Sequence, residues 1–158
     1  MAEIPSGSVV EGLLFLLHSS DKATRAEATR SLGEMGSFAI GGLLQALRDP
    51  KWAVRYRAVE ALGMISDPQI DPVLIKALDD TRDHVRYIAA KMLGIRKTTA
   101  ATHCLIKCLR DENEFVRISA ARALGSLEDP RGIQALRNAL GREPVERVAI
   151  EIKKSLGM

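Results

Sequence analysis

The side chains with the most reactive chemistry stand together in the second half of the chain. Cys104 and Cys108 are the two cysteines of the sequence, and His103 precedes the first of them. On a helix, a spacing of four residues puts both thiols on one face, as in half of a metal site. A tetrahedral zinc site needs four ligands, and the sequence offers no second ligand pair. We therefore interpret the cysteines as small buried hydrophobes and expect no metal and no cofactor.

Motifs of hydrolytic and phosphate-binding enzymes are missing from the sequence. It contains no nucleophile elbow, no glycine-rich phosphate loop and no His-Glu-x-x-His motif. The adjacent glycines Gly41-Gly42 fall inside an apolar helical segment without a loop signature. We therefore expect no catalytic residue and a protein that is not an enzyme.

Four arginines recur along the chain at a nearly constant interval: Arg25, Arg55, Arg86 and Arg117. A row of arginines could form a stripe that binds phosphate groups. However, an aspartate stands six residues before each of the last three arginines: Asp49, Asp80 and Asp111. Acidic partners at a fixed offset favour a structural role for these arginines over a phosphate-binding one.

Composition indicates a folded domain in a reducing compartment. Of the 158 residues, 46% are hydrophobic and 27% charged, and the net charge of +3 is too small and too dispersed for a dedicated nucleic-acid binder. The longest apolar run near the start, Leu13 to Leu17, is far shorter than the about 20 residues of a membrane span. No basic segment precedes it, which argues against a signal peptide. We expect a cytoplasmic protein.

Several markers repeat with one period and indicate an internal repeat. Leu-Gly pairs recur at Leu32-Gly33, Leu62-Gly63, Leu93-Gly94 and Leu124-Gly125. The Ala-Leu pairs at 46–47, 77–78 and 139–140 keep the same register, with Cys108-Leu109 as their counterpart. A fifth, blurred copy carries Arg147-Val148 where the other copies have Val-Arg. Terminal copies are expected to be atypical because one side meets water.

Each copy is predicted to form a helix A, a tight turn and a helix B. In the third copy, Asp67-Pro68 predicts the start of helix A, which runs to about Leu78. Helix B is predicted from Arg82 to Leu93, with Gly94 as a left-handed C-cap. In the second copy, one face of helix B is apolar: Val54, Ala58, Ala61 and Leu62. No alternating strand pattern interrupts these elements.

The frame D-x-x-x-x-V-R-x-x-A-x-x-x-L-G resembles the short HEAT-like repeat of the phycobilisome-lyase type. The resemblance implies an all-α fold, a right-handed α-solenoid of about five two-helix repeats, similar to armadillo-like helical proteins. The single domain spans residues 1–158, with repeats at approximately 5–33, 37–63, 67–94, 98–125 and 129–157. It also implies that the B helices line the concave side. It implies no common activity, because members differ in what they bind.

The same resemblance bears on the charged residues and on one enzyme class. It implies a ladder of ion pairs between adjacent repeats, made by Asp49, Arg55, Asp80, Arg86, Asp111 and Arg117. Deoxyhypusine hydroxylases are HEAT-repeat proteins that bind two irons through His-Glu motifs. No histidine here is followed by glutamate, which excludes that activity.

The outward positions of the B helices form rows that contain four of the six aromatic residues. One row holds Tyr56, Tyr87 and Ile118, and neighbouring rows hold His84 with Phe115, Lys91 with Arg122, and Trp52. Aromatic side chains with mixed charge around them are typical of a protein-binding groove. The competing interpretation is that Trp52 and Phe115 fold over the turns as packing.

We expect a protein-binding scaffold or regulatory module whose concave surface binds a protein or peptide partner. The predicted partner-binding residues are Trp52, Tyr56, His84, Tyr87, Lys91, Phe115, Ile118 and Arg122. The alternatives are a bilin lyase-like protein and a DNA-binding HEAT-repeat protein. Nucleic acid is the less favoured ligand because Glu60 interrupts the basic row and Asp83 and Glu114 lie close to it. The identity of the partner and the oligomeric state stay open.

Overall fold

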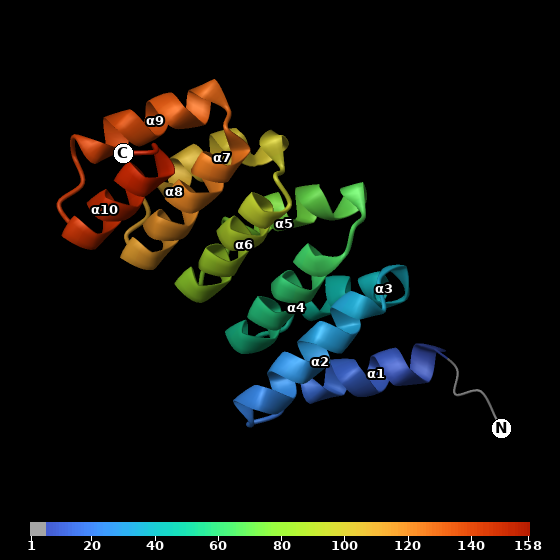
Figure 1. Cartoon of the computed structure of the whole chain (residues 1–158). Coiled ribbons are helices and arrows are strands. Elements are labelled where there is room, and N and C mark those ends of the chain that lie inside the picture. The colour runs from blue at the N-terminus through green and yellow to red at the C-terminus, as the bar shows by residue number, and fades with distance from the viewer. Residues whose placement is uncertain (1–5) are drawn as a thin grey trace. The chain divides into compact units, whose positions relative to one another are not determined.

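The computed structural model describes residues 6–158, which form ten α-helices, two short 3-10 turns and no strand. Helices joined by tight turns lie antiparallel in five pairs (Figure 1). This confirms the predicted all-α solenoid of two-helix repeats. The pairs belong to two compact units, Met1–Ile70 and Asp71–Met158, each of which is described by itself.

Unit 1 contains the first two helix pairs: α1 (Ser6–Leu16), α2 (Lys22–Glu34), α3 (Ser37–Ala46) and α4 (Trp52–Met64). The A helices α1 and α3 pack side by side, and so do the B helices α2 and α4. Each A helix also packs against the B helix of its own repeat. The apolar face predicted for α4 is buried, because Val54, Ala58, Ala61 and Leu62 are at most 2% exposed.

Unit 2 contains three further pairs: α5 (Asp71–Ala77) with α6 (Asp83–Ile95), α7 (Thr102–Cys108) with α8 (Glu114–Leu127), and α9 (Pro130–Leu140) with α10 (Glu146–Ser155). The B helices α6, α8 and α10 form one layer, in which α8 packs against both of the others. The A helices α7 and α9 pack against each other and against α8. Fully buried leucines at one repeat position, Leu93 and Leu124, occupy the centre of this unit.

Side-chain caps fix where several helices begin. The Asp21 carboxylate accepts the backbone N–H of Thr24 at 2.7 Å, and Asn113 Oδ1 accepts that of Phe115 at 2.8 Å. Asp129 caps α9 in the same way, and Pro130 takes the first helical position, where a missing N–H costs nothing. These caps satisfy N–H groups that the first turn of a helix leaves without a partner.

Helix A of the third repeat differs from its predicted form. Asp67 accepts the N–H of Gln69 as expected of a cap, but a 3-10 turn (η1, Pro68–Ile70) follows, and α5 begins only at Asp71. Pro72 explains the break, since it has no N–H and its ring conflicts with the carbonyl four residues earlier, that of Pro68. The prediction of one continuous helix from Pro68 was therefore wrong.

Gly94 is not the left-handed C-cap that the sequence predicts. It lies inside α6, which continues to Ile95, and the left-handed residue is Lys97, with φ of 52°. The glycine is required for another reason: a Cβ at position 94 would lie 2.8 Å from Cα of Ala123. Gly94 therefore lies where the backbones of α6 and α8 come close together.

Candidate binding surface on the B helices

The four recurring arginines share one structural role. Each donates from Nη1 to the backbone carbonyl six residues earlier, in the turn before its own helix: Arg25 to Ser19, Arg55 to Asp49, Arg86 to Asp80 and Arg117 to Asp111, at 2.6–2.9 Å. These carbonyls belong to the turns between helices A and B, where the backbone has few partners of its own. The arginines therefore close the turns, and their charge is not displayed as a stripe.

In unit 2 the same arginines also bridge neighbouring repeats. Arg86 donates from Nε and Nη2 to the two carboxylate oxygens of Asp111, at 2.7 and 3.0 Å. Both side chains are about nine-tenths buried. The hydrogen bonds that Arg86 donates to Asp111 raise the pKa of the Arg86 guanidinium. A two-pronged pair of this kind is among the stronger charged interactions in proteins.

The next rung uses a glutamate that the sequence frame does not predict. Arg117 donates to both oxygens of Glu143, each at 2.9 Å, and the Glu143 side chain is 5% exposed. Burial works to raise the pKa of Glu143, but the hydrogen bonds from Arg117 and from the Val145 N–H outweigh it and lower the pKa. The partner of Arg117 in the following repeat is thus Glu143, which sequence reasoning missed.

Unit 1 has its own version of the turn contact. The Asp49 carboxylate accepts the N–H of Lys51 at 2.8 Å and lies 3.2 Å from Nε2 of His18. Arg25 instead donates to the backbone carbonyls of Ser19 and Ser20. In this unit, therefore, His18 lies beside Asp49 where an arginine pairs with the equivalent acid in unit 2.

A hollow of about 240 Å³ opens between the N-terminal halves of α6 and α8. It is lined by Asp83, His84, Tyr87, Asn113 and Phe115. Its surface is mostly apolar because Tyr87 and Phe115 contribute their rings. Three predicted partner-binding residues, His84, Tyr87 and Phe115, are thus brought together at one place.

Hydrogen bonds hold the polar wall of the hollow in a fixed arrangement. Asp83 Oδ1 accepts the backbone N–H of His84 at 2.8 Å and lies 2.7 Å from Nδ1 of its ring. Asp83 Oδ2 accepts a hydrogen bond from Nδ2 of Asn113, a residue of the next repeat, at 2.6 Å. The hydrogen bond with the His84 side chain is the main reason that the pKa of Asp83 lies below its ordinary value. Asp83 is therefore ionised, and its position is fixed before any ligand arrives.

Phe115 forms the outer edge of the hollow and is itself supported by a cation. The Arg147 guanidinium lies 4.7 Å from the centre of the Phe115 ring, and its Nε donates to Glu114 at 2.7 Å. Phe115 nevertheless remains 50% exposed. The ring is thus held in place on one side and open to solvent on another.

The remaining predicted residues lie outside the hollow. Trp52 and Tyr56 belong to α4 of unit 1, where Trp52 is exposed and the Arg57 guanidinium lies 5.3 Å from the Tyr56 ring. Tyr56, Tyr87 and Ile118 are half-buried, so these outward positions are partly exposed to solvent.

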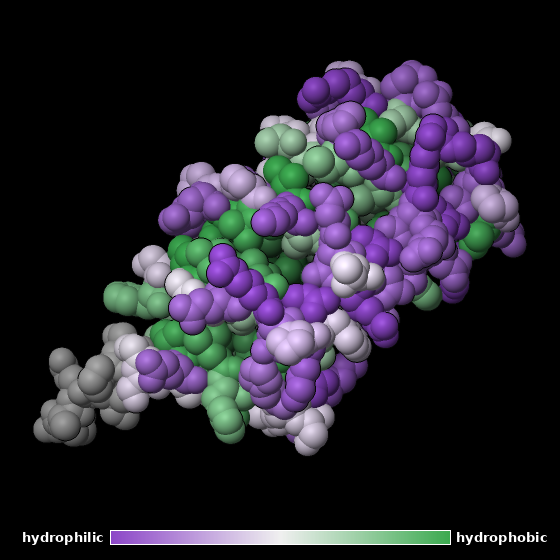
Figure 2. All heavy atoms as spheres, turned by 180° about the vertical axis from the view of Figure 1, so that it is seen from behind, coloured by the Kyte–Doolittle hydropathy of each residue, from purple (hydrophilic) through white to green (hydrophobic). Residues whose placement is uncertain are grey.

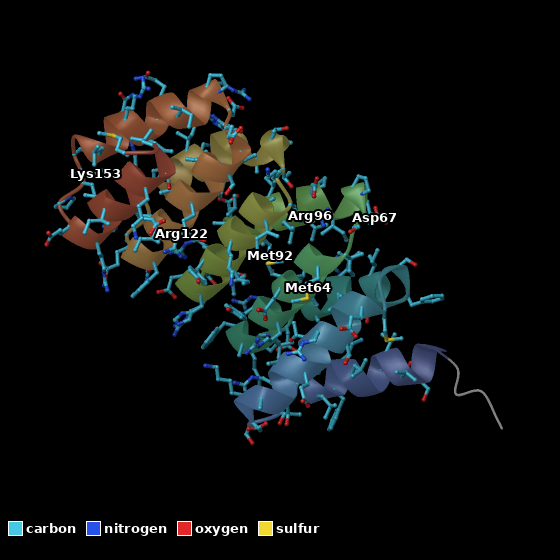
Figure 3. All side chains as sticks on the ribbon, in the orientation of Figure 1. Met64, Asp67, Met92, Arg96, Arg122 and Lys153 are labelled. Atoms are coloured by element: carbon cyan, nitrogen blue, oxygen red, sulfur yellow. The ribbon has the colours of Figure 1, made fainter. Side chains whose placement is uncertain are left out.

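The two predicted cations differ in their surroundings. Arg122 extends from α8 (Figure 3). It donates to Glu151 of α10 at 2.9 Å, and this hydrogen bond raises the pKa of the arginine and lowers that of the glutamate. Lys91 on α6 is exposed and forms no ion pair within residues 6–158. Of the two, Lys91 is therefore the charge that remains available to a ligand.

Two residues of this surface, Asn113 and Arg147, are not among those predicted from the sequence. Asn113 precedes a predicted helix, so its type signals an N-cap, but its bond to Asp83 depends on how the repeats stack. Arg147 stands where the fifth repeat has Arg-Val in place of Val-Arg, and its guanidinium lies over the Phe115 ring. The departure from the frame was the available signal.

The cysteines lie away from this surface. Cys108 is buried, and burial raises the pKa of its thiol to about 12, while Cys104 is half-buried. Among the residues that the structure describes, no group of three or more His, Cys, Asp or Glu side chains could hold a metal ion. None of the helices in residues 6–158 has the length and apolar content that a membrane span requires.

Comparison with known sequences identifies the family. The profile of HEAT repeats matches residues 10–93, 40–110 and 72–157, which together cover most of the chain. The chain belongs to the HEAT-repeat family. The HEAT-like frame predicted from the Leu-Gly and Val-Arg markers is confirmed. No curated protein matches the sequence.

Solved structures resemble this HEAT-repeat chain at low sequence identity. A chain in the structure of the complex of CpcE and CpcF of phycocyanin lyase from Nostoc sp. PCC7120 is 23% identical in sequence, with a TM-score of 0.83. The match covers 94% of this chain and 98% of that chain. Human deoxyhypusine hydroxylase is 22% identical, with a TM-score of 0.66 over 95% of this chain and 62% of that chain. A designed armadillo repeat protein in complex with the peptide (KR)4 is 20% identical, with a TM-score of 0.60 over 94% and 80%. Identities this low show a shared fold and nothing about activity.

Proposed function

We propose that this HEAT-repeat chain is a non-enzymatic, cytoplasmic binding module that holds a protein partner through its B helices. The hollow lined by Tyr87 and Phe115 carries the proposal. Binding energy at protein interfaces is concentrated in a few anchors, which fill apolar pockets surrounded by polar groups. Tyr87 and Phe115 supply the apolar lining, and Asp83 with Asn113 supplies the polar wall.

The size of the hollow favours a side chain of a protein over a small molecule. At about 240 Å³ it is smaller than the roughly 300–1,000 Å³ of small-molecule and cofactor sites. One bulky apolar side chain fits a hollow of this size. Lys91, exposed on α6, lies on the same helix as Tyr87 and would favour an acidic group in the partner.

Rigidity of the lining supports the same conclusion. Asp83, His84 and Asn113 are joined by hydrogen bonds of 2.6–2.8 Å, and Phe115 is backed by Arg147. A site that is already ordered loses less conformational entropy when a partner binds. The hollow therefore requires no rearrangement to accept a side chain.

Photo-crosslinking at the hollow tests the proposal. Phe115 is replaced by p-benzoylphenylalanine in the full chain, which is then irradiated in lysate of the native host. The matched control carries the same group at Ile95, which is 63% exposed in unit 2 but does not line the hollow. We expect a protein adduct from position 115 that is absent from position 95 and is lost on adding Tyr87→Ala. Identical adducts from both positions, or none from position 115, would contradict the proposal.

A role in a phycobiliprotein lyase is the second candidate, favoured by the likeness in length and fold to the phycocyanin lyase chain. Its test is direct: the purified chain is mixed with a bilin and a phycobiliprotein, and bilin absorbance is followed. A spectral change that Phe115→Ala abolishes would support this candidate over the protein-binding module. DNA binding is disfavoured because Arg122 is paired with Glu151 and Arg147 with Glu114. Affinity for duplex DNA that falls steeply with salt would revive it.

A further inference from the structure

The A helices of unit 1 carry two phenylalanines at positions where the fold predicts water-facing residues. Phe15 is 77% exposed and Phe38 is 71% exposed. In the register of the other repeats, Phe15 corresponds to Gln45, Lys76, Lys107 and Asn138. Phe38 corresponds to Ser8, Gln69, Ala100 and Arg131. No other copy has a large apolar residue at either place, so packing within the repeat does not account for these rings.

The surface around the two rings is apolar and almost free of charge. Leu16 and Leu44 are each 38% exposed on the same two helices. Glu11 is the one charged residue in α1, and α3 contains none. Figure 2 shows the resulting concentration of hydrophobic side chains over this part of unit 1. Such exposed apolar patches mark sites of association.

Two glycines lie beside the rings and have no role in the fold of the chain itself. Gly12 precedes Phe15 by three residues, and Gly41 follows Phe38 by three, so each glycine shares a helix face with a ring. A Cβ at either glycine would meet nothing within 4 Å. A glycine inside an exposed helix costs about 1 kcal/mol relative to alanine, and here no internal contact requires it.

We propose that the α1–α3 face, defined by Gly12, Phe15, Phe38 and Gly41, binds the same face of a second copy of this chain. A twofold interface must be complementary to itself, which means that one surface carries both the projections and the depressions. Each of the two helices carries one ring and one glycine a turn away. The ring of one copy packs over the glycine of the other.

Charge supports this choice of occupant, and area limits its strength. The face has no lysine or arginine with which to bind an anionic membrane surface, and its single charge is the acidic Glu11. Two helices of 11 and 10 residues present a face of about 15 by 20 Å. Counted on both copies, a face of this size amounts to roughly 600 Å², about half of the roughly 1,200 Å² at which stable specific interfaces begin. We therefore expect a reversible dimer with a dissociation constant of about 10–100 µM.

Analytical ultracentrifugation of the full chain between about 1 and 500 µM tests the proposal. Phe38→Lys and, separately, Phe15→Lys should weaken self-association at least tenfold. The control is Ile95→Lys, which adds the same charge at an exposed apolar residue of unit 2 and should change nothing. Gly41→Leu should also weaken the dimer, although it fills open space in the monomer and should raise the stability of the monomer, because leucine favours the helical backbone over glycine.

Three results would overturn the dimer. One is a single monomeric species over the whole concentration range. Another is a dimer that persists unchanged in both phenylalanine variants. The third is flotation of the chain with phosphatidylcholine vesicles that Phe15→Lys and Phe38→Lys abolish, because the face would then bind lipid. None of these variants changes a residue that lines the hollow of unit 2. The result therefore tests the dimer and leaves the proposed function to its own experiment.

Discussion

Arg86 and Asp111, which are 25 residues apart in the sequence, form an ion pair that joins the turns of two neighbouring repeats. Arg86 Nε and Nη2 hold the carboxylate of Asp111 at 2.7 and 3.0 Å, while its Nη1 donates to the carbonyl of Asp80 at 2.9 Å. One guanidinium thus closes the turn of its own repeat and fixes the turn of the next. Arg117 repeats this arrangement in unit 2, where it donates to the carbonyl of Asp111 and to the carboxylate of Glu143, so the contact links three successive turns.

Removal of this guanidinium should destabilise the fold. We expect Arg86→Ala to lower the free energy of unfolding by about 2 kcal/mol, because the Asp111 carboxylate is left nine-tenths buried without its partner. Arg86→Lys should lower the free energy of unfolding by about half as much. Lysine keeps the positive charge but cannot donate two parallel hydrogen bonds to one carboxylate. Thermal and urea unfolding measure both, with the exposed Arg110→Ala as the control. An unchanged melting curve together with lost partner binding would assign Arg86 to a binding site.

The Arg117–Glu143 pair should make stability depend on pH in the acid range. The pKa of Glu143 is lower in the folded chain than its ordinary value of 4.5. A lowered folded pKa contributes stability above the unfolded pKa, and the contribution is lost as the pH falls through the folded value. We therefore expect Glu143→Gln to be less stable than the parent by about 1–2 kcal/mol near pH 7, and by much less near pH 3.

Urea titrations of parent and variant at both pH values measure this difference. Glu146→Gln changes an exposed glutamate at the start of α10, so it serves as the control and should show no such convergence. A difference between parent and Glu143→Gln that stays constant from pH 7 to pH 3 would show that the carboxylate charge is not the source of the stability.

The helix pairs could be predicted because their causes are local and repeated. The Leu-Gly and Val-Arg markers hold one register over four copies, and one helical face of α4 is apolar, so burial of Val54 and Leu62 follows directly. The break at η1 was also encoded, in Pro72, but the stronger signal of Asp67-Pro68 concealed it. Local competition between two prolines decides that helix start.

The contacts of the hollow could not be predicted in the same way. Asn113 and Asp83 form a hydrogen bond although they are 30 residues apart in the sequence. Arg147 of α10 contacts the ring of Phe115 of α8. Both contacts depend on the offset between neighbouring repeats, which no single copy specifies. Glu143 illustrates the problem. The repeat frame places the acidic partner of Arg117 at position 142, but in the structure Glu143, one residue later, pairs with Arg117.

The two cysteines should differ strongly in reactivity. Burial raises the pKa of Cys108 to about 12, so its thiolate is scarce at neutral pH. Cys104 is half-buried and one turn away. We expect iodoacetamide to modify Cys104 in the folded chain and Cys108 only after addition of denaturant. Mass spectrometry of Cys104→Ser and Cys108→Ser separates the two sites. Equal rates for both thiols in the folded chain would contradict the buried, structural role of Cys108.

Gly94 and Gly41 provide a matched pair that separates close packing from helix propensity. Both are helical glycines, in α6 and α3, but a Cβ at position 94 would lie 2.8 Å from Cα of Ala123, whereas a Cβ at position 41 would meet nothing. Backbone cannot move aside as a flexible side chain can, so Gly94→Ala should push α6 and α8 apart. We expect it to lower the free energy of unfolding by about 1–3 kcal/mol.

Gly41→Ala should act in the opposite direction. Alanine favours the helical backbone, and with open space around it the variant should gain up to about 1 kcal/mol. Both variants are compared with the parent by urea unfolding at about 1 µM protein, well below the concentration at which the α1–α3 face is proposed to associate. If Gly94→Ala proves as stable as the parent, Ala123 yields without cost and the glycine does not set the distance between α6 and α8. If instead the two variants change stability with opposite signs, contact between α6 and α8 explains the glycine of the Leu93-Gly94 pair, because Gly94 lies inside α6 and has no left-handed cap conformation to lose.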